Sequence, residues 1–340
     1  MSIQDILPYR LPNFKNKRLL DPHVVIVGAG ASIAACKTDK NGREVPLLKN
    51  IHNILRLTDE LEKYNFSNEQ MGDFEKLFSD IYGRDEYKDL QEKLEFEVCN
   101  YFSDLKIPDE PTLYDYLVLS LTEKDAIISF NWDPFLMQAY RRNIDVGNLP
   151  ELIFPHGNSG VGLCNDCKVK GYAGCLCPNC FKALEQMPLL YPTGKKDYNS
   201  KSIIKNEWNR AKDVLSRAAG ITVYGYSAPV TDVEAVELMK SAISISQMKD
   251  IAPFTIINLP ENENEQRRKW SEFYDVKMVL YCNEFKQSLL WRNPRVSLET
   301  LFDAILQGQP RSTQKSFKEF SKLRELQDYV KTITEFDMCI

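Results

Sequence analysis

Short apolar runs alternate along this chain with amphipathic segments. The run VVIV, inside residues 21–34, has no polar alternation and leads into the glycine-rich turn GAGAS. A β-branched run of this kind is typical of a strand that helices cover on both faces. Further strands are predicted at residues 126–130, 151–154, 221–227, 254–260 and 276–282. Because these strands alternate with helices and end in glycine or polar residues, the pattern predicts a doubly wound, Rossmann-like parallel α/β sheet.

Helical periodicity dominates residues 46–104, where apolar side chains recur at spacings of three and four among many charges. This pattern predicts a helical insertion after the first strand–turn–helix unit. Amphipathic helices are also expected at residues 200–217, at TDVEAVELMKSAIS and in the polar last fifty residues. The insertion and the helices at about 295–335 are candidate contact surfaces for a partner. The alternative, that they pack on their own domain, is equally open.

The pattern divides the chain into three parts. We expect an N-terminal arm (1–20), a nucleotide-binding domain (21–290) that includes a cysteine-rich module (about 160–183), and a C-terminal helical segment (291–340).

Composition narrows the class of protein. The 340 residues are 43% hydrophobic and 27% charged, with a net charge of -5, so no basic surface for direct nucleic-acid binding is indicated. The chain has no apolar run long enough for a membrane helix and no secretory signal, so we expect a cytoplasmic protein. In that setting, nine cysteines favour metal binding over disulfide bonds.

Two C-x-x-C knuckles carry the strongest local signal. They predict a tetrahedral thiolate site for a structural Zn²⁺ ion, with Cys164, Cys167, Cys177 and Cys180 as ligands. Cys175 is a fifth thiol that is able to replace Cys177 in this scheme. Four thiolates close the site, so His156, which precedes the first knuckle, is not needed as a ligand.

Polar side chains follow several predicted strands. Asn131 and Asp133 come after the strand 126–130, and His156 comes after 151–154. Ligands bind at the carboxyl ends of parallel strands, so these three side chains converge on one crevice if their strands are neighbours. The alternatives are a helix N-cap pair for Asn131 and Asp133, and a backbone-bonded turn histidine for His156.

The turn GAGAS at residues 28–32 opens a helix. Its glycines allow a pyrophosphate to approach the backbone at a helix N-terminus. Ile33 stands where a third glycine of the dinucleotide motif would be, so a plain tight turn is the alternative. GYSAPVTD repeats the arrangement of strand, glycine and hydroxyl, with Asp232 at a helix cap.

Taken in order, these motifs resemble those of the sirtuin superfamily. GAGAS resembles its glycine-rich NAD loop, SFNWD (129–133) its Thr-Gln-Asn-Ile-Asp segment, and Pro155-His156-Gly157 its catalytic His-Gly. The paired knuckles are similar to its zinc ribbon, although their separation is shorter. The order agrees from about residue 21 to 285.

The resemblance also implies ligand contacts. Gly225 and Ser227 are similar to the family's phosphate turn, and Asn258 to its adenosine-ribose asparagine. The residues that would then hold NAD⁺ are Gly28, Ala29, Gly30, Ser32, Gly225, Ser227, Asp232 and Asn258.

The departures from the family concern the second substrate. The Gly-Ile-Pro-Asp-Phe-Arg stretch of protein deacylases is replaced by residues 31–48, their Gln is Phe130, and no segment for an acyl-lysine peptide is evident. GYSAPVTD looks like the bacterial sirtuin-like effector branch, whose members cleave NAD⁺ in anti-phage defence, often beside a second protein. A regulated NAD⁺ hydrolase is therefore expected, as a homo-oligomer with a regulatory partner. The alternatives are an NAD-dependent protein deacylase and a non-enzymatic sensor or scaffold that binds NAD⁺ or ADP-ribose.

For a hydrolase the residues suggest roles. Nicotinamide leaves as a neutral base through an oxocarbenium-like transition state, so a poised water and a proton acceptor are the main needs. His156 is the expected acceptor. Asn131 would hold the ribose hydroxyl and the water, and Asp133 the carboxamide or cationic charge.

Overall fold

Six parallel strands form the central sheet of the computed structural model, which describes residues 21–191, 202–228, 232–245, 252–271, 273, 279–298, 301 and 315–337. Their order is β3-β2-β1-β7-β8-β9, with each neighbouring pair parallel. The strands are β1 (His23–Val27), β2 (Ala126–Ser129), β3 (Glu151–Ile153), β7 (Gly220–Tyr224), β8 (Phe254–Ile257) and β9 (Val279–Cys282). The predicted doubly wound sheet is thereby confirmed, and each of its strands overlaps a predicted one.

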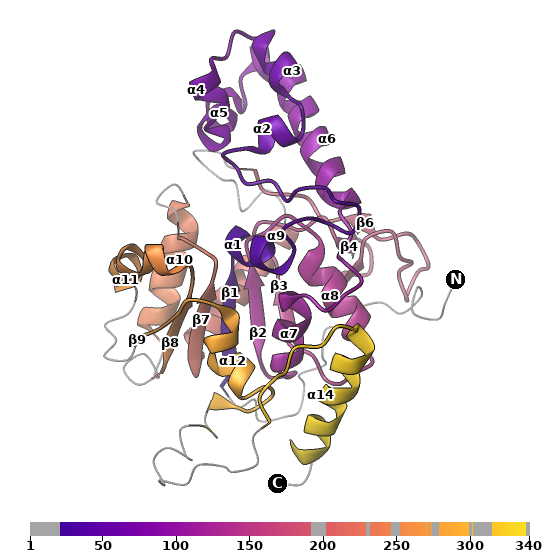
Figure 1. Cartoon of the computed structure of the whole chain (residues 1–340). Helices are drawn as coiled ribbons and strands as arrows, with labels where there is room; N and C mark the ends of the chain where they lie inside the picture. Colours follow the sequence, from indigo (N-terminus) through magenta and orange to yellow (C-terminus); the bar gives the residue numbers. More distant parts are fainter. Residues whose placement is uncertain are drawn as a thin grey trace.

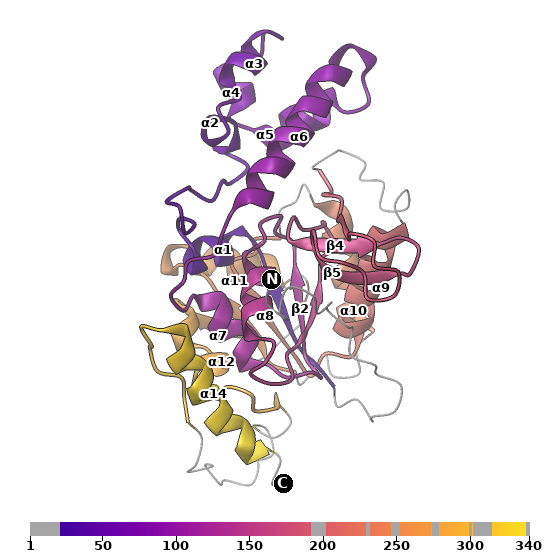
Figure 2. The ribbon, with the colours of Figure 1, turned by 90° about the vertical axis from the view of Figure 1, so that its right-hand side faces the viewer.

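Helices cover both faces of this sheet (Figure 2). On one face lie α1 (Ala29–Ala35), α7 (Leu113–Ser120), α8 (Phe135–Asn143) and α12 (Leu289–Arg292); on the other lie α9 (Ser202–Ser216) and α10 (Val233–Ser244). β1 and β2 are fully buried because helices cover them on either side. The connections near β9 are η3 (Pro260–Asn262), α11 (Glu263–Ser271) and η4 (Phe285–Gln287).

A helical arm leaves the sheet after α1 and projects away from it (Figure 1). Its elements are α2 (Ile51–Ile54), α3 (Thr58–Glu62), α4 (Asn68–Met71), α5 (Phe74–Ile81), η2 (Asp85–Tyr87) and α6 (Lys88–Asp104). α6 buries Leu90, Leu94 and Val98 at four-residue spacing, as an amphipathic helix does. The helical content expected for 46–104 is present, although turns break it into short helices before α6 begins.

The cysteine-rich module is more regular than the sequence predicted. It contains an antiparallel sheet of β5 (Val169–Tyr172), β4 (Val161–Cys164) and β6 (Glu185–Gln186), in that order. Sequence patterning predicted no strands in this module because they are short and mix glycine, charged and apolar residues.

The C-terminal helix α14 (Leu323–Asp337) packs on its own domain. Leu326 and Val330 are fully buried. Gln327 donates hydrogen bonds from Nε2 to the Arg142 carbonyl and to Asn143 Oδ1 at the end of α8. For this face of α14 the structure therefore favours the packing alternative over a partner surface. Parts of the predicted arm (1–20) and C-terminal segment lie outside the described residues. Within the described part of the chain, no helix has the length and hydropathy of a membrane span.

Candidate functional site

A cavity of about 970 Å³ lies at the carboxyl ends of the central strands. The strand order reverses between β1 and β7, which is where open parallel sheets bind ligands. Its lining includes all of the side chains and turns predicted to bind or react: Gly28, Ala29, Gly30, Ser32, Asn131, Asp133, His156, Gly225, Ser227, Asp232 and Asn258. Residues 45–49 and Glu75, from the side of the helical arm, close another wall.

The glycines of the first turn pack directly on the turn after β7. The Gly28 amide donates to the Tyr224 carbonyl at 3.1 Å, and the Gly30 amide donates to the Gly225 carbonyl at 3.0 Å. A Cβ on Gly28 would lie 2.6 Å from the Cα of Tyr226. Gly225 has a φ of +62°, and a Cβ there would meet the backbone nitrogen of Ala31 at 2.2 Å. Both glycine motifs thus bring two backbone turns together at the cavity, and the Gly30 amide is already used in that contact.

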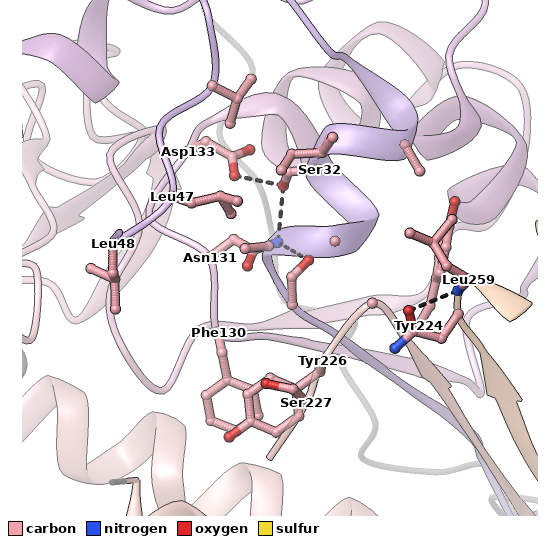
Figure 3. Close-up of a pocket in the computed structure, with 18 of the residues that line it drawn as sticks. Ser32, Leu47, Leu48, Phe130, Asn131, Asp133, Tyr224, Tyr226, Ser227 and Leu259 are labelled. Carbon is pink, nitrogen blue, oxygen red and sulfur yellow. Dashed lines mark hydrogen bonds between the residues drawn. The ribbon is translucent and has the colours of Figure 1, made fainter. Parts of the chain in front are cut away.

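Asn131 is fixed by its side-chain nitrogen. Nδ2 lies 2.8 Å from the Gly28 carbonyl, 2.9 Å from Ser32 Oγ and 3.1 Å from the Tyr114 hydroxyl. Asn158 holds the backbone of the same loop, because its Nδ2 donates to the carbonyls of Asn131 and Asp133. The orientation of the Asn131 carboxamide is therefore set, and Oδ1 is the atom that remains for a ligand. Figure 3 shows Asn131 beneath Ser32, with Leu47 and Leu48 across from α1.

Asp133 is a buried carboxyl at the edge of this network. Ser32 Oγ donates to Oδ2 at 2.6 Å, and the Phe135 amide donates to Oδ1 at 3.2 Å. Burial raises the pKa of Asp133 from 3.8 to about 6, although these two hydrogen bonds oppose the shift. Asp133 thus accepts a hydrogen bond from the amide two residues ahead, but the N-cap residue of α8 is Pro134, and Asn131 faces Gly28 and Ser32, so the two residues are not the N-cap pair of this helix.

His156 lies in the cavity and pairs with Asp232. Its Nε2 is 3.3 Å from Asp232 Oδ2, and the Tyr226 hydroxyl is 3.2 Å from that same oxygen. The imidazole also meets the ring of Phe130 edge-on, with centroids 4.8 Å apart, and Phe130 stacks on Tyr226 at 4.6 Å. Asp232 occupies the predicted N-cap position of α10, yet its side chain makes no capping hydrogen bond and turns to His156 instead.

Ser227 and Asn258 border the far part of the cavity (Figure 3 labels Ser227). Ser227 is exposed, after the Gly225 turn. Asn258 Oδ1 accepts hydrogen bonds from the Leu259 amide at 2.8 Å and from Asn262 Nδ2 at 3.3 Å. This contact orients the amide group of Asn258 at the end of β8.

The four predicted zinc ligands form a cluster apart from this cavity. The sulfurs of Cys164, Cys167, Cys177 and Cys180 all lie within 4.8 Å of one another. Cys175 is outside the cluster, which decides between Cys175 and Cys177. Burial tends to raise the pKa of Cys177, but the backbone amides of Cys180 and Asn179 outweigh it and lower the pKa to about 7. A four-thiolate set of this size fits a structural zinc ion, and the imidazole of His156 is not part of it.

Sequence reasoning did not find Tyr114, Trp208 or the pairing of Asp232 with His156. Tyr114 is fully buried on α7 and reaches Ser32 Oγ at 2.7 Å. Trp208, on α9, lies with its ring centroid 5.8 Å from that of His156. Tyr114 belongs to a helix that is buried almost all round, and Trp208 belongs to an amphipathic helix, so their surroundings predict burial and give no sign of a polar neighbour.

Comparisons with known proteins return structures alone. No protein-family model matches the chain. No curated protein matches it either. Among solved structures, it is similar to a Sir2 complex with the inhibitor EX-527, 2'-O-acetyl-ADP-ribose and a deacetylated p53 peptide, at 16% identity and a TM-score of 0.37, over 84% of this chain and 94% of that one. It is also similar to a structure from work on the mechanism and regulation of Sir2 enzymes, at 16% identity and a TM-score of 0.38, over 77% of this chain and 87% of that one. A third similar structure is a Sir2 homolog–NAD complex, at 16% identity and a TM-score of 0.32, over 75% of this chain and 82% of that one. Scores this low assign no ligand, and the fold described above stands on the strand order itself.

Proposed function

We propose that this protein is an NAD⁺ glycohydrolase, which cleaves the nicotinamide–ribose bond to give nicotinamide and ADP-ribose. The observation that carries the proposal is one cavity bordered by the glycine turns, Asn131 and the His156–Asp232 pair. Its volume of about 970 Å³ is at the upper end of small-molecule sites, as an extended dinucleotide requires. The order of motifs that resembles the sirtuins supports the same substrate.

The phosphates of NAD⁺ would lie against the turn after β1 and the turn after β7. Gly28 and Gly225 have no side chain, so a phosphate would approach the backbone closely there. Ser227 offers an exposed hydroxyl. Asn258, held by Leu259 and Asn262, would bind the adenosine ribose. This assignment directs the nicotinamide ribose toward Asn131 and His156.

At the reacting end, water attacks the anomeric carbon as the bond to nicotinamide breaks. Asn131 Oδ1 accepts a hydrogen bond from the water or a ribose hydroxyl, because Nδ2 is engaged with Gly28, Ser32 and Tyr114. His156 accepts the proton released from the water, directly or through the ribose hydroxyl, and later returns it to solvent. Asp232 orients the imidazole and stabilises its protonated form.

Asp133 and Ser32 would complete the pocket for the carboxamide of nicotinamide. Ionised Asp133 accepts a hydrogen bond from the Ser32 hydroxyl, and this fixes Ser32 as the acceptor of the hydrogen bond from Asn131 Nδ2. The zinc ion, where bound to the four thiolates, would brace the module and take no part in the reaction.

The aromatic wall around His156 supports water as the acceptor in preference to an acyl-lysine peptide. Phe130 fills the position beside the imidazole, and Tyr226 and Trp208 pack against the ring of Phe130. All three are buried. We further propose that the enzyme is a regulated, NAD⁺-depleting effector of anti-phage defence that assembles with itself and with a regulatory protein, as the sequence resemblance implies.

The experiment is a nicotinamide-release assay on the purified protein, alone and with the product of the neighbouring gene. A hydrolase gives ADP-ribose with or without acyl-lysine peptide. Formation of O-acyl-ADP-ribose that requires the peptide would instead identify a deacylase. Tight NAD⁺ binding by calorimetry, with no turnover under any partner condition, would identify a sensor or scaffold.

A further inference from the structure

The strand that leads to His156 is an edge strand completed by side chains. Among the residues that the structure describes, β3 pairs with β2 on one side and with no strand on the other. On its other side, the Leu152 carbonyl accepts a hydrogen bond from Lys170 Nζ at 2.9 Å, and the Phe154 amide donates to Glu207 Oε2 at 2.7 Å. Backbone groups that a further strand would bind are thus satisfied by Lys170 and Glu207.

Lys170 and Glu207 also form an ion pair with each other. Nζ lies 2.9 Å from Oε1 and 3.1 Å from Oε2. The side chains are only 9% and 12% exposed, so removal of one partner leaves a charge in a poorly solvated place. Lys170 belongs to β5 of the cysteine-rich module, and Glu207 belongs to α9. The pair therefore joins three separate elements at the last residues before His156.

The neighbours of this ion pair hold His156 from other directions. Trp208 follows Glu207 and contacts the imidazole ring. The His156 carbonyl accepts a hydrogen bond of 2.9 Å from the amide of Leu190, which lies on the segment that leaves the cysteine-rich module. Gly157 has a φ of +75°, and a Cβ there would lie 2.0 Å from the Pro188 carbonyl oxygen. The loop 155–157 is therefore clamped between that segment and α9.

We propose that Lys170 and Glu207 are positioning residues for His156, and that their ion pair ties the cysteine-rich module to the reacting imidazole. Neither residue lines the cavity, so neither touches the substrate. Their loss changes the placement of His156 while the glycine turns and Asn258 continue to bind NAD⁺. The kinetic consequence rests on the function proposed above, whereas the change in the surroundings of His156 does not.

The test uses the variants Glu207→Gln and Lys170→Met, with Lys170→Arg as the conservative rescue. Glu207→Gln keeps an oxygen for the Phe154 amide and loses the charge, so the edge of the sheet is retained. The matched control is Lys182→Met, which removes an ion pair with Asp166 from the same module, at side chains 71% and 65% exposed.

Two readouts are measured on the full-length protein. In the nicotinamide-release assay, Glu207→Gln and Lys170→Met are expected to lower kcat at least tenfold and to change KM for NAD⁺ less than twofold. Lys170→Arg should recover most of kcat, and Lys182→Met should match the wild type. The second readout is NMR of protein labelled with ¹³C-histidine. The chain has three histidines, and the signal that is absent in His156→Ala is assigned to His156. The His156 signal should move in Glu207→Gln and Lys170→Met, while those of His23 and His52 stay in place.

An unchanged His156 signal in both Glu207→Gln and Lys170→Met would overturn the proposal, as would an equal shift in Lys182→Met. A loss of activity that appears only in KM would also overturn it. If the wild-type protein releases no nicotinamide under any condition, the proposed function fails, and the NMR comparison still decides the role of the ion pair.

Discussion

Exchange of Asp133 for Asn removes a carboxylate whose ionisation the fold opposes. Burial raises its pKa from 3.8 to about 6, so the folded state binds a proton more tightly than the unfolded chain does. The cost to stability is absent below pH 3.8, grows up to about pH 6 and is complete above it. At pH 7 it amounts to about 3 kcal/mol, and at pH 5 to about half of that.

Acidification from pH 7 to pH 5 should therefore stabilise the wild type by about 1 kcal/mol relative to Asp133→Asn. The measurement is the free energy of unfolding of both proteins in urea at the two pH values. The difference between the proteins at one pH also contains the altered hydrogen bonds from Ser32 and from the Phe135 amide. Only the change of that difference with pH reports the buried carboxylate.

Asp39 is the control for this experiment, because it is buried and its pKa moves in the opposite direction. Burial tends to raise that pKa, but hydrogen bonds from Arg43, Lys106 and Asn41 outweigh burial and lower it. Its stabilising effect is present above pH 3.8 and is lost only as the pH falls through the lower, folded value. The difference between wild type and Asp39→Asn should thus stay constant from pH 7 to pH 5. If Asp133→Asn behaves in the same way, the Asp133 carboxyl is not held in the poorly solvated site described here.

Two further predictions concern the glycine turns and the metal site. Gly225→Ala should lower the free energy of unfolding by about 3 kcal/mol, through backbone strain and overpacking, and weaken NAD⁺ binding in calorimetry. Gly42→Ala, at a φ of +79° with open space around it, should cost only about 1 kcal/mol, and equal losses would refute the packing account. Cys177→Ser should lose bound zinc and melt at a lower temperature, whereas Cys175→Ser should keep its metal. Metal analysis of the two purified variants decides this, and zinc retained by Cys177→Ser would remove that residue from the ligand set.

The strands and the cysteine site were predictable because their signals are local. Residues 24–27 form a continuous buried apolar run, and the spacing of each C-x-x-C knuckle brings its two sulfurs close together. Ligands of parallel sheets bind at the carboxyl ends of the strands, and this also predicts the edge of the sheet at which Asn131 and His156 lie. The division of the chain into an arm, a domain and a C-terminal segment stays a prediction, and so do the roles of the individual site residues.

The partners of the site residues depend on tertiary contacts that no local pattern encodes. A helix start at Asp232 predicts a cap, and only the tertiary contact with the loop after β3 shows that its carboxylate lies beside His156. Lys170 in a strand of a polar module looks like a surface residue until α9 brings Glu207 beside it. Ser32 was predicted among the residues that hold NAD⁺, and only the tertiary structure shows that its hydroxyl donates a hydrogen bond to Asp133.

The decisive measurement is the release of nicotinamide from NAD⁺ by the purified protein, with its partner where one is required. We expect equal amounts of nicotinamide and ADP-ribose from the wild type, and a loss of at least about 100-fold in Asn131→Ala and in His156→Ala. His52→Ala, a histidine of the helical arm, should keep its turnover. Near-normal turnover in folded His156→Ala or Asn131→Ala protein would contradict the account.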